Sequence, residues 1–269
     1  MDVEKITKIG FFHFGKDYDK PMETLRRALN KWPRQTVSGA LLVLPEGFNI
    51  CRLYSDTNGT CTPVADVVSL LKVLTKEYDI SILACLILEI SGKKRNCSVL
   101  IDGDDEFPIC EKMVDDGSQN YVPSTEDYDR ANPKPYKDVL IGCLICADSE
   151  PPKPINYADP RPDIERCQSF RKAMKATEYA PEIVCIPSHP TTNSTQALPI
   201  CWQDYNAIVY ASSSSGIDRG SCIGFNGKEL LNMQGEVSGI RFADLLTKSA
   251  LCCGRLSDDG VCCTSNVNT

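Results

Sequence analysis

The sequence contains few histidines, no surplus of basic residues and no long apolar run. Only two histidines occur in 269 residues, and the net charge is −7 with a pI of about 5.0. An acidic chain without basic patches interleaved with aromatic residues has no electrostatic footprint for nucleic acid, so we expect no nucleic-acid partner. No apolar stretch approaches the roughly 20 residues that cross a bilayer, so we expect no membrane segment either.

The first residues also lack the pattern of a secretory leader. Residues 1–8 lead straight into a strand-like run, without a basic stretch followed by an apolar one. We therefore expect a cytoplasmic protein. The fifteen cysteines are an odd number, which argues against a fully paired disulfide framework, and many lie in apolar runs where a cysteine behaves as a small buried hydrophobe.

Apolar runs alternate with amphipathic segments along most of the chain. Strands are predicted at 6–14, 39–44, 80–89, 96–102, 106–113, 138–146, 182–187, 207–212, 220–225, 228–233 and 237–245. Helices are predicted at 21–32, 64–74, 163–176 and 195–205. The alternation predicts an α/β fold. A single sheet of all these strands would be too large for the four helices to cover on both faces. We therefore expect two sheets stacked face to face, with helices outside.

Two irregular stretches interrupt this pattern. Residues 114–135 are polar and rich in Asp, Asn, Ser and Pro, and residues 149–162 are rich in Pro, so both are predicted to be loops. The domain is predicted to cover residues 1–248. Residues 249–269 are predicted to form a polar, Cys-rich C-terminal tail.

Three residues with complementary chemistry end predicted strands. Glu46 follows the run that begins at Gly39, Lys112 ends the run that begins at Glu106, and Cys146 ends the run that begins at Asp138. Ligands in open α/β sheets bind at the carboxyl ends of the strands. A thiol becomes a good nucleophile when a neighbouring base accepts its proton, and an ammonium group stabilises both the thiolate and a tetrahedral oxyanion.

Each of these residues has a more ordinary interpretation when taken alone. A Glu after a strand is usually a solvated loop residue, a Lys at a strand end is usually exposed, and a Cys in an apolar run is usually inert core. Their shared context favours a thiol-dependent acyl-transfer site. The backbone N–H of Ala147 is a candidate second donor to the oxyanion.

The motifs resemble those of the nitrilase superfamily, the carbon–nitrogen hydrolases, over residues 8–246. The similarity is carried by the run GALLVLPE ending at Glu46, the run IGCLICAD around Cys146, the run EIVCIPS ending at Ser188, and the hairpin SCIGFNGKELL. Lys112 is placed by its strand context and by lying 34 residues before the cysteine.

This resemblance implies a four-layer α-β-β-α sandwich of two mixed sheets with helices on the outer faces. It also implies a homodimer or higher homo-oligomer without metal or cofactor. Glu46 would be the general base, Cys146 the nucleophile and Lys112 the stabiliser of the intermediate. The implied reaction is hydrolysis of a small linear amide through a thioester, with release of ammonia or an amine.

The residues near the nucleophile refine these expectations. Nitrilases tend to have an aromatic residue and then Glu after the cysteine, so Ala147 favours an amide over a nitrile substrate. Glu126, in the long loop, is a candidate second carboxylate near Lys112, although a solvated loop position is the commoner interpretation. His189 follows a predicted strand and is expected to line the substrate pocket; a Cys146–His189 dyad is the alternative.

Two other cysteine patterns are weaker indications of a disulfide or a metal site. Cys143 and Cys146 match a C-x-x-C spacing, but residues three apart on a strand point to opposite faces, so we expect neither a disulfide nor a shared metal. The tail holds two Cys-Cys pairs, Cys252–Cys253 and Cys262–Cys263. A zinc site, disulfides and no role at all remain open for them.

Two rival functions use the same chain. A non-enzymatic relative would keep the fold as a scaffold or binding protein, which the two irregular loops would suit. Alternatively, the acyl group would pass to an amine instead of water, with the same three residues.

Overall fold

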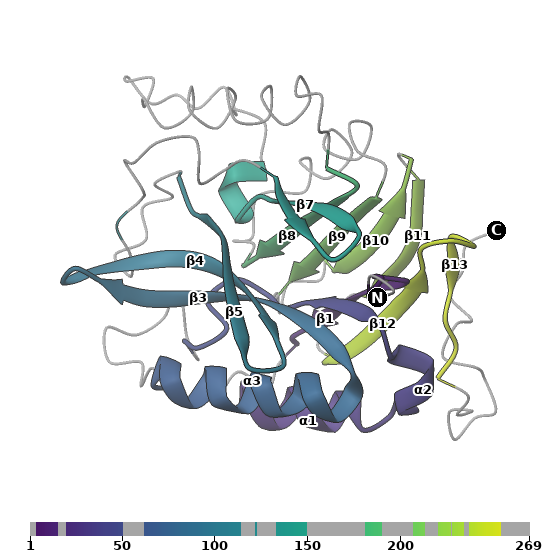
Figure 1. Cartoon of the computed structure of the whole chain (residues 1–269), viewed down its shortest axis with the longest axis horizontal. Coiled ribbons are helices and arrows are strands. Elements are labelled where there is room, and N and C mark those ends of the chain that lie inside the picture. The colour runs from purple at the N-terminus through teal and green to yellow at the C-terminus, as the bar shows by residue number, and fades with distance from the viewer. Residues whose placement is uncertain are drawn as a thin grey trace.

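The apolar runs form the strands of two sheets in the computed structural model of the chain. The structure describes residues 4–15, 20–50, 62–113, 122, 133–149, 181–189, 207–212, 220–226, 228–233 and 237–253. Within these residues the two sheets are stacked as layers, and helices lie outside one of them (Figure 1).

The first sheet has the strand order β13-β12-β1-β2-β3-β4-β5. Its strands are β1 (Lys8–His13), β2 (Ala40–Val43), β3 (Ile80–Ile90), β4 (Lys93–Asp102), β5 (Asp105–Glu111), β12 (Gly239–Asp244) and β13 (Ser249–Ala250). The strands β1, β2 and β3 are parallel neighbours, and the remaining neighbours are antiparallel. Parallel pairing brings the carboxyl ends of β1, β2 and β3 to one edge, which is where Glu46 follows β2.

Helices α1 (Pro21–Leu29), α2 (Arg34–Val37) and α3 (Val64–Tyr78) lie along the outer face of the first sheet (Figure 1). Pro21 occupies the first turn of α1, where its missing N–H has no intrahelical partner to lose. In α3 the residues Val67, Leu71 and Leu74 recur at helical spacing and are buried against the sheet. Burial of this stripe fixes α3 on the sheet.

The second sheet has the strand order β11-β10-β9-β8-β7-β6. Its strands are β6 (Lys134–Tyr136), β7 (Val139–Cys143), β8 (Ile183–Ser188), β9 (Ala207–Ser212), β10 (Ser221–Phe225) and β11 (Lys228–Met233). The strands β7, β8 and β9 are parallel and the others antiparallel, so this sheet is also mixed. The residues after β7 and β8 therefore meet at one edge.

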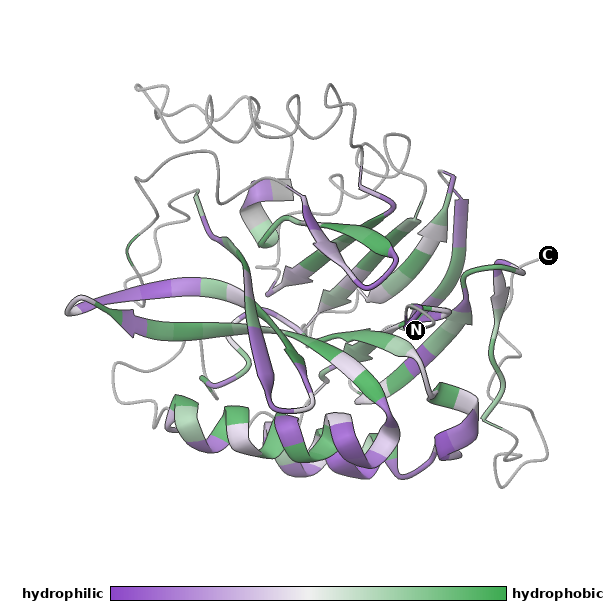
Figure 2. Ribbon diagram, in the orientation of Figure 1, coloured by the Kyte–Doolittle hydropathy of each residue, from purple (hydrophilic) through white to green (hydrophobic). Residues whose placement is uncertain are grey.

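The main core lies between the two sheets. One buried cluster joins side chains of the first sheet, such as Phe11 and Leu83, to side chains of the second, such as Ile141 and Val209. Figure 2 shows the apolar residues along the strands of both layers. Strands buried on both faces read as continuous apolar runs, which explains why they were recognisable in the sequence.

The structure confirms the α/β sandwich of two mixed sheets. It corrects the prediction for the strand before Cys146: β7 ends at Cys143, and Cys146 begins a 3₁₀ turn, Cys146–Ser149, instead of ending the strand. It also places a short strand, β6, at the end of the segment predicted as a loop at 114–135. The helices predicted at 163–176 and 195–205 lie outside the described residues.

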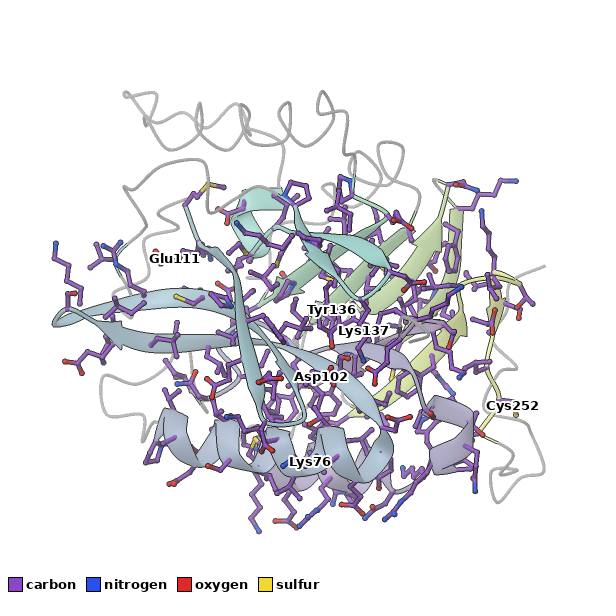
Figure 3. The ribbon with its side chains drawn as sticks, viewed as in Figure 1. Lys76, Asp102, Glu111, Tyr136, Lys137 and Cys252 are labelled. Atoms are coloured by element: carbon purple, nitrogen blue, oxygen red, sulfur yellow. The ribbon has the colours of Figure 1, made fainter. Side chains whose placement is uncertain are left out.

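The start of the predicted tail contacts the domain. The strand β13 pairs with β12, and Cys253 is buried in the core beneath the helices. Cys252, labelled in Figure 3, is disulfide-bonded. Cys262 and Cys263 lie outside the described residues. The domain boundary at residue 248 stays a prediction.

Candidate active site

The chain leaves β2 in a way that buries an acidic side chain. Leu44 continues the pairing by donating its N–H to Leu83 O at 2.9 Å, and Glu46 then lies 2% exposed. Gly47 has a φ of 62°, a left-handed conformation that suits glycine, and it turns the chain back towards the sheet. Phe48 N donates to Cys85 O at 2.9 Å after this turn. The Glu46 side chain is thus held between two points where the backbone pairs with β3.

Lys112 and Glu46 form a buried ion pair. Lys112 Nζ lies 2.6 Å from Glu46 Oε1, and the two side chains are 0% and 1% exposed. Two charges removed from water in this way are maintained only with good geometry and further hydrogen bonds. Asn96 Nδ2 donates to the same oxygen at 2.7 Å, and His189 N donates to Glu46 Oε2 at 3.1 Å. Both carboxylate oxygens are therefore satisfied.

Asn96 connects the carboxylate to the lysine strand. Its side chain donates to Glu46, while its Oδ1 accepts the thiol hydrogen of Cys85 at 3.0 Å. Its backbone oxygen accepts a hydrogen bond from Lys112 N at 2.8 Å, just beyond the end of β5. One buried residue of β4 thus positions both members of the ion pair.

Cys146 follows β7 on a strained turn. Its φ is 47°, a left-handed conformation that costs a non-glycine residue roughly 1–3 kcal/mol. Leu144 N still pairs with Cys185 O at 3.0 Å, so the turn begins after that residue. The sulfur accepts a hydrogen bond from Ser188 Oγ at 3.4 Å and donates to His189 O at 3.8 Å. Strain that surrounding contacts maintain is typical of functional positions.

Asp148 ties this turn to the lysine segment. The carboxylate is 1% exposed, and its two oxygens lie 3.2 and 3.3 Å from Met113 N. Asp148 N donates to Ile145 O at 3.0 Å. The residue after Lys112 is therefore fixed to the turn that begins at Cys146, although the two come from different sheets.

The environment of Cys146 favours the neutral thiol. The pKa of Cys146 is raised to about 12, mainly by burial and also by the nearby Glu46 carboxylate. The Lys112 ammonium and the Ser188 hydrogen bond lower that pKa and offset part of the rise. At neutral pH the sulfur thus keeps its proton, with a carboxylate and an ammonium close by.

The structure brings together the three residues that the sequence singled out. Glu46 contacts Lys112 directly, and Cys146 joins them through His189, which bonds Glu46 by its N–H and Cys146 by its carbonyl. These contacts of His189 are made by its backbone, not by the ring that a Cys–His dyad requires. Ala147 belongs to the 3₁₀ turn.

Two further expectations have separate outcomes. Glu126 lies outside the described residues. Cys143 and Cys146 are not joined by a disulfide, in agreement with the expectation from their spacing. In the described part of the chain, no three His, Cys, Asp or Glu residues are grouped to hold a metal ion, and no helix there is long and apolar enough to cross a membrane.

Sequence reasoning missed the residues that support the three. Asn96 and Tyr210 had no predicted role beyond belonging to predicted strands, and Ser188 had none beyond ending a motif of the family resemblance. An Asn in the middle of a buried strand is a usable signal, because a buried amide needs partners. Ser188 and Tyr210 carry no such signal, since Ser ends many strands and Tyr favours them.

Comparisons with known proteins identify the fold. No protein-family model matches the chain, and no curated protein sequence matches it. Solved structures of the amidase from Nesterenkonia sp. AN1 are similar. A cysteine-to-alanine mutant in complex with butyramide has a TM-score of 0.65 at 17% identity, over 91% of this chain and 93% of that one.

Two further structures of the same amidase agree. A glutamate-to-glutamine mutant, with acrylamide added at the active site cysteine, has a TM-score of 0.61 at 17% identity over 89% and 93% of the two chains. A cysteine-to-serine mutant, described as an amidase from the nitrilase superfamily, has a TM-score of 0.60 at 17% identity over 90% and 93%. The chain therefore has the fold of the nitrilase-superfamily amidases.

Proposed function

We propose that this protein is a carbon–nitrogen hydrolase of the nitrilase superfamily that hydrolyses a small, linear, non-peptide amide through a thioester on Cys146. The buried Glu46–Lys112 ion pair beside the Cys146 thiol is the observation that carries the proposal. A buried ion pair is weak evidence for stability, because apolar residues of similar volume often serve as well. Its presence next to a strained nucleophile supports catalysis over a scaffold role.

The first half-reaction begins with the neutral thiol. Glu46 accepts the proton of Cys146 as the sulfur attacks the amide carbon, so the S–C bond forms and the carbonyl electron pair moves to oxygen. The pKa of about 12 for Cys146 means that little thiolate exists beforehand, so proton transfer accompanies attack. Lys112 donates to the oxyanion, with the Ala147 N–H as the second donor.

The intermediate then expels its nitrogen. The oxyanion electron pair reforms the carbonyl, the C–N bond breaks, and the protonated Glu46 gives its proton to the leaving ammonia or amine. In the second half-reaction Glu46 accepts a proton from water as the oxygen attacks the thioester. Collapse releases the carboxylic acid product, and the departing sulfur takes the proton back from Glu46. Proton and charge balance in each half.

The preference for amides has two supports. Ala147 is small, which differs from the aromatic residue that nitrilases tend to have after the nucleophile. Structures of the similar amidase contain butyramide and acrylamide. We also propose Glu126 as a second carboxylate near Lys112, and His189 as a residue of the substrate site.

A panel of small amides, carbamoyl compounds and nitriles tests the proposal, with mass spectrometry to detect a thioester adduct. Cys146→Ala is expected to lower amide turnover at least about a thousandfold. The matched control is Cys143→Ala, which removes another buried free thiol of the same segment and is expected to keep turnover. Unchanged turnover in Cys146→Ala would reject the assignment.

Acyl transfer remains distinguishable from hydrolysis. A competing amine such as hydroxylamine intercepts the thioester, and the ratio of hydroxamate to acid measures the partition. Hydrolysis predicts mostly acid when the amine is dilute. A product that is mostly hydroxamate under the same condition favours acyl transfer.

We propose that the protein is a homo-oligomer, most simply a homodimer, and that it is located in the cytoplasm. The absence of disulfides at Cys85, Cys143 and Cys185 favours a reducing compartment, whereas the disulfide at Cys252 does not. Sedimentation analysis tests the assembly, and a monomer at micromolar concentration would reject it. Fractionation of the native cells tests the compartment.

A further inference from the structure

Two hydroxyl groups lie in series beside the Cys146 sulfur. Ser188 ends β8, and its Oγ donates to Cys146 Sγ at 3.4 Å. Tyr210 lies on the neighbouring strand β9, and its hydroxyl donates to Ser188 Oγ at 2.8 Å. Both residues are buried, at 2% and 4% exposure. Because the tyrosine supplies the hydrogen of its own bond to Ser188, the serine hydrogen is available for the sulfur.

The register of the two strands creates this series. In the parallel pairing of β8 and β9, Ser188 faces Ser212, and Ile186 faces Tyr210. Residues two apart share a face of a sheet, so Tyr210 lies on the same face as Ser188, one step back along the strand. The Tyr210 ring is packed in an apolar cluster with Ile186 and Leu144, which fixes the direction of its hydroxyl.

The residues around the Cys146 sulfur therefore come from both sheets. Glu46 and Lys112 follow strands of the first sheet, whereas Ser188 and Tyr210 belong to the second. Lys112 bonds Glu46 and, in the proposed mechanism, the oxyanion. Ser188 is the hydroxyl donor that the structure places on the sulfur itself.

We infer that Ser188 and Tyr210 form a hydrogen-bond relay that stabilises and orients the Cys146 thiolate. Ser188 touches the reacting sulfur, and Tyr210 is a positioning residue that acts through Ser188. The role of the relay in amide turnover rests on the proposed function, whereas its effect on the reactivity of the Cys146 thiol is independent of that function. A donor to the sulfur favours the charged form, in the same direction as the effect of Ser188 on the Cys146 pKa.

The relay would act twice in the reaction. Negative charge develops on sulfur as Glu46 takes the proton during attack, and again when the thioester collapses and sulfur departs. In both steps Ser188 donates to the sulfur while Tyr210 keeps the serine from rotating away. The hydrogen bond is weakest with the thioester, where the sulfur carries no charge.

Alkylation of Cys146 by iodoacetamide, followed by peptide mass spectrometry, tests the relay without any substrate. Ser188→Ala is expected to slow alkylation of Cys146 about three- to tenfold, because a lost donor raises the thiol pKa and part of the effect is offset by higher nucleophilicity. Tyr210→Phe is expected to slow it about two- to threefold. Thermal unfolding of each variant verifies that it is folded.

Ser212→Ala is the matched control. Ser212 is a buried serine on β9, and its Oγ has no hydrogen-bond partner in the described part of the chain. Ser212→Ala removes a hydroxyl from the same sheet and leaves the hydrogen bonds of Ser188 and Tyr210 in place, so the rate of Cys146 alkylation is expected to stay unchanged. A slowing equal to that of Ser188→Ala would overturn the inference, because it would reveal a general effect of packing.

The double variant Ser188→Ala/Tyr210→Phe decides whether Tyr210 acts through Ser188. The relay predicts that the double variant is no slower than Ser188→Ala alone. Additive slowing, or normal alkylation in Ser188→Ala, would overturn the inference. These outcomes are separate from those of the proposed function. If no amide is turned over but Ser188→Ala slows alkylation of Cys146, the relay stands and the proposed function fails. If amides are turned over but Ser188→Ala does not change the alkylation rate, only the relay fails.

Discussion

The Tyr136 hydroxyl donates a 2.6 Å hydrogen bond to Asp102 Oδ2 and so joins the two sheets; both residues are labelled in Figure 3. Tyr136 pairs with Val139, at the end of β7 away from Cys146. Tyr136 belongs to β6 and Asp102 ends β4. Lys137 Nζ lies 3.2 Å from the same carboxylate oxygen, and Ser81 Oγ lies 2.8 Å from the Tyr136 hydroxyl. This polar cluster fixes the second sheet on the first at a distance from Glu46, Lys112 and Cys146.

Loss of the Tyr136 hydroxyl is expected to destabilise the fold without altering the site. Tyr136→Phe removes a partly buried hydrogen bond to a charged group, which contributes about 1.5–3 kcal/mol. The free energy of unfolding from urea denaturation measures the effect, and amide turnover of the folded variant should equal that of the wild type. A stability change below about 0.5 kcal/mol would mean that the contact contributes nothing net.

The same residue gives a pH dependence of stability. Burial is the main cause that raises the pKa of Tyr136 above its ordinary value of 10.0, and the hydrogen bond to Asp102 adds to it. Because the folded-state pKa is the higher one, this stabilisation is complete below pH 10 and is lost as the pH rises above it. The difference in unfolding free energy between wild type and Tyr136→Phe should therefore shrink above about pH 10. A constant difference across that range would contradict the assignment.

Asn96 is expected to matter for turnover more than for folding. Asn96→Ala removes a donor from Glu46 and is expected to lower kcat about tenfold or more, with a smaller change in KM, because Glu46, the proposed general base, loses its orientation. Asn49→Ala is the control: Asn49 is equally buried, but its amide bonds the backbone of Ile87. Equal losses of kcat in both variants would indicate general damage to this edge of the sheet.

The sequence was sufficient for the layers of the fold because buried strands are apolar throughout. It also singled out Glu46, Lys112 and Cys146, since each follows an apolar run whose carboxyl end has to lie at a sheet edge. The structure places the three close together, and their catalytic roles stay predictions. It misplaced the end of β7, because Leu144 and Ile145 are as apolar as the strand before them. The left-handed φ of Cys146 leaves no mark in composition, and neither do the contacts of its sulfur with Ser188 and His189.

The supporting hydrogen bonds were out of reach for a different reason. Asn96 and Glu46 are fifty residues apart in sequence, and Ser188 meets Cys146 only after two sheets have been assembled. Such contacts depend on strand order and register, which periodicity alone does not determine. Tyr136 was included in no prediction, because its partner Asp102 belongs to the other sheet.

Substitutions in the Glu46–Lys112 ion pair test whether its buried charges serve amide turnover or the stability of the fold. Glu46→Gln or Lys112→Met alone leaves one buried group without its partner, which is expected to cost about 3 to 5 kcal/mol of unfolding free energy. The double variant Glu46→Gln/Lys112→Met removes both charges and is expected to cost less than the sum of the two. All three variants should lose amide turnover, because the base or the oxyanion donor is missing.

Lys76→Met is the matched control for this comparison. Lys76 pairs with Asp104 at 2.5 Å, but both side chains are exposed, so water screens the pair and its loss is expected to change the unfolding free energy little. Urea denaturation of the five proteins, wild type included, gives the coupling energy directly. If the double variant recovers stability and stays inactive, the charges are retained for chemistry. If the two single losses simply add, then Glu46 and Lys112 act on stability independently and the buried pair is not the unit that the site requires.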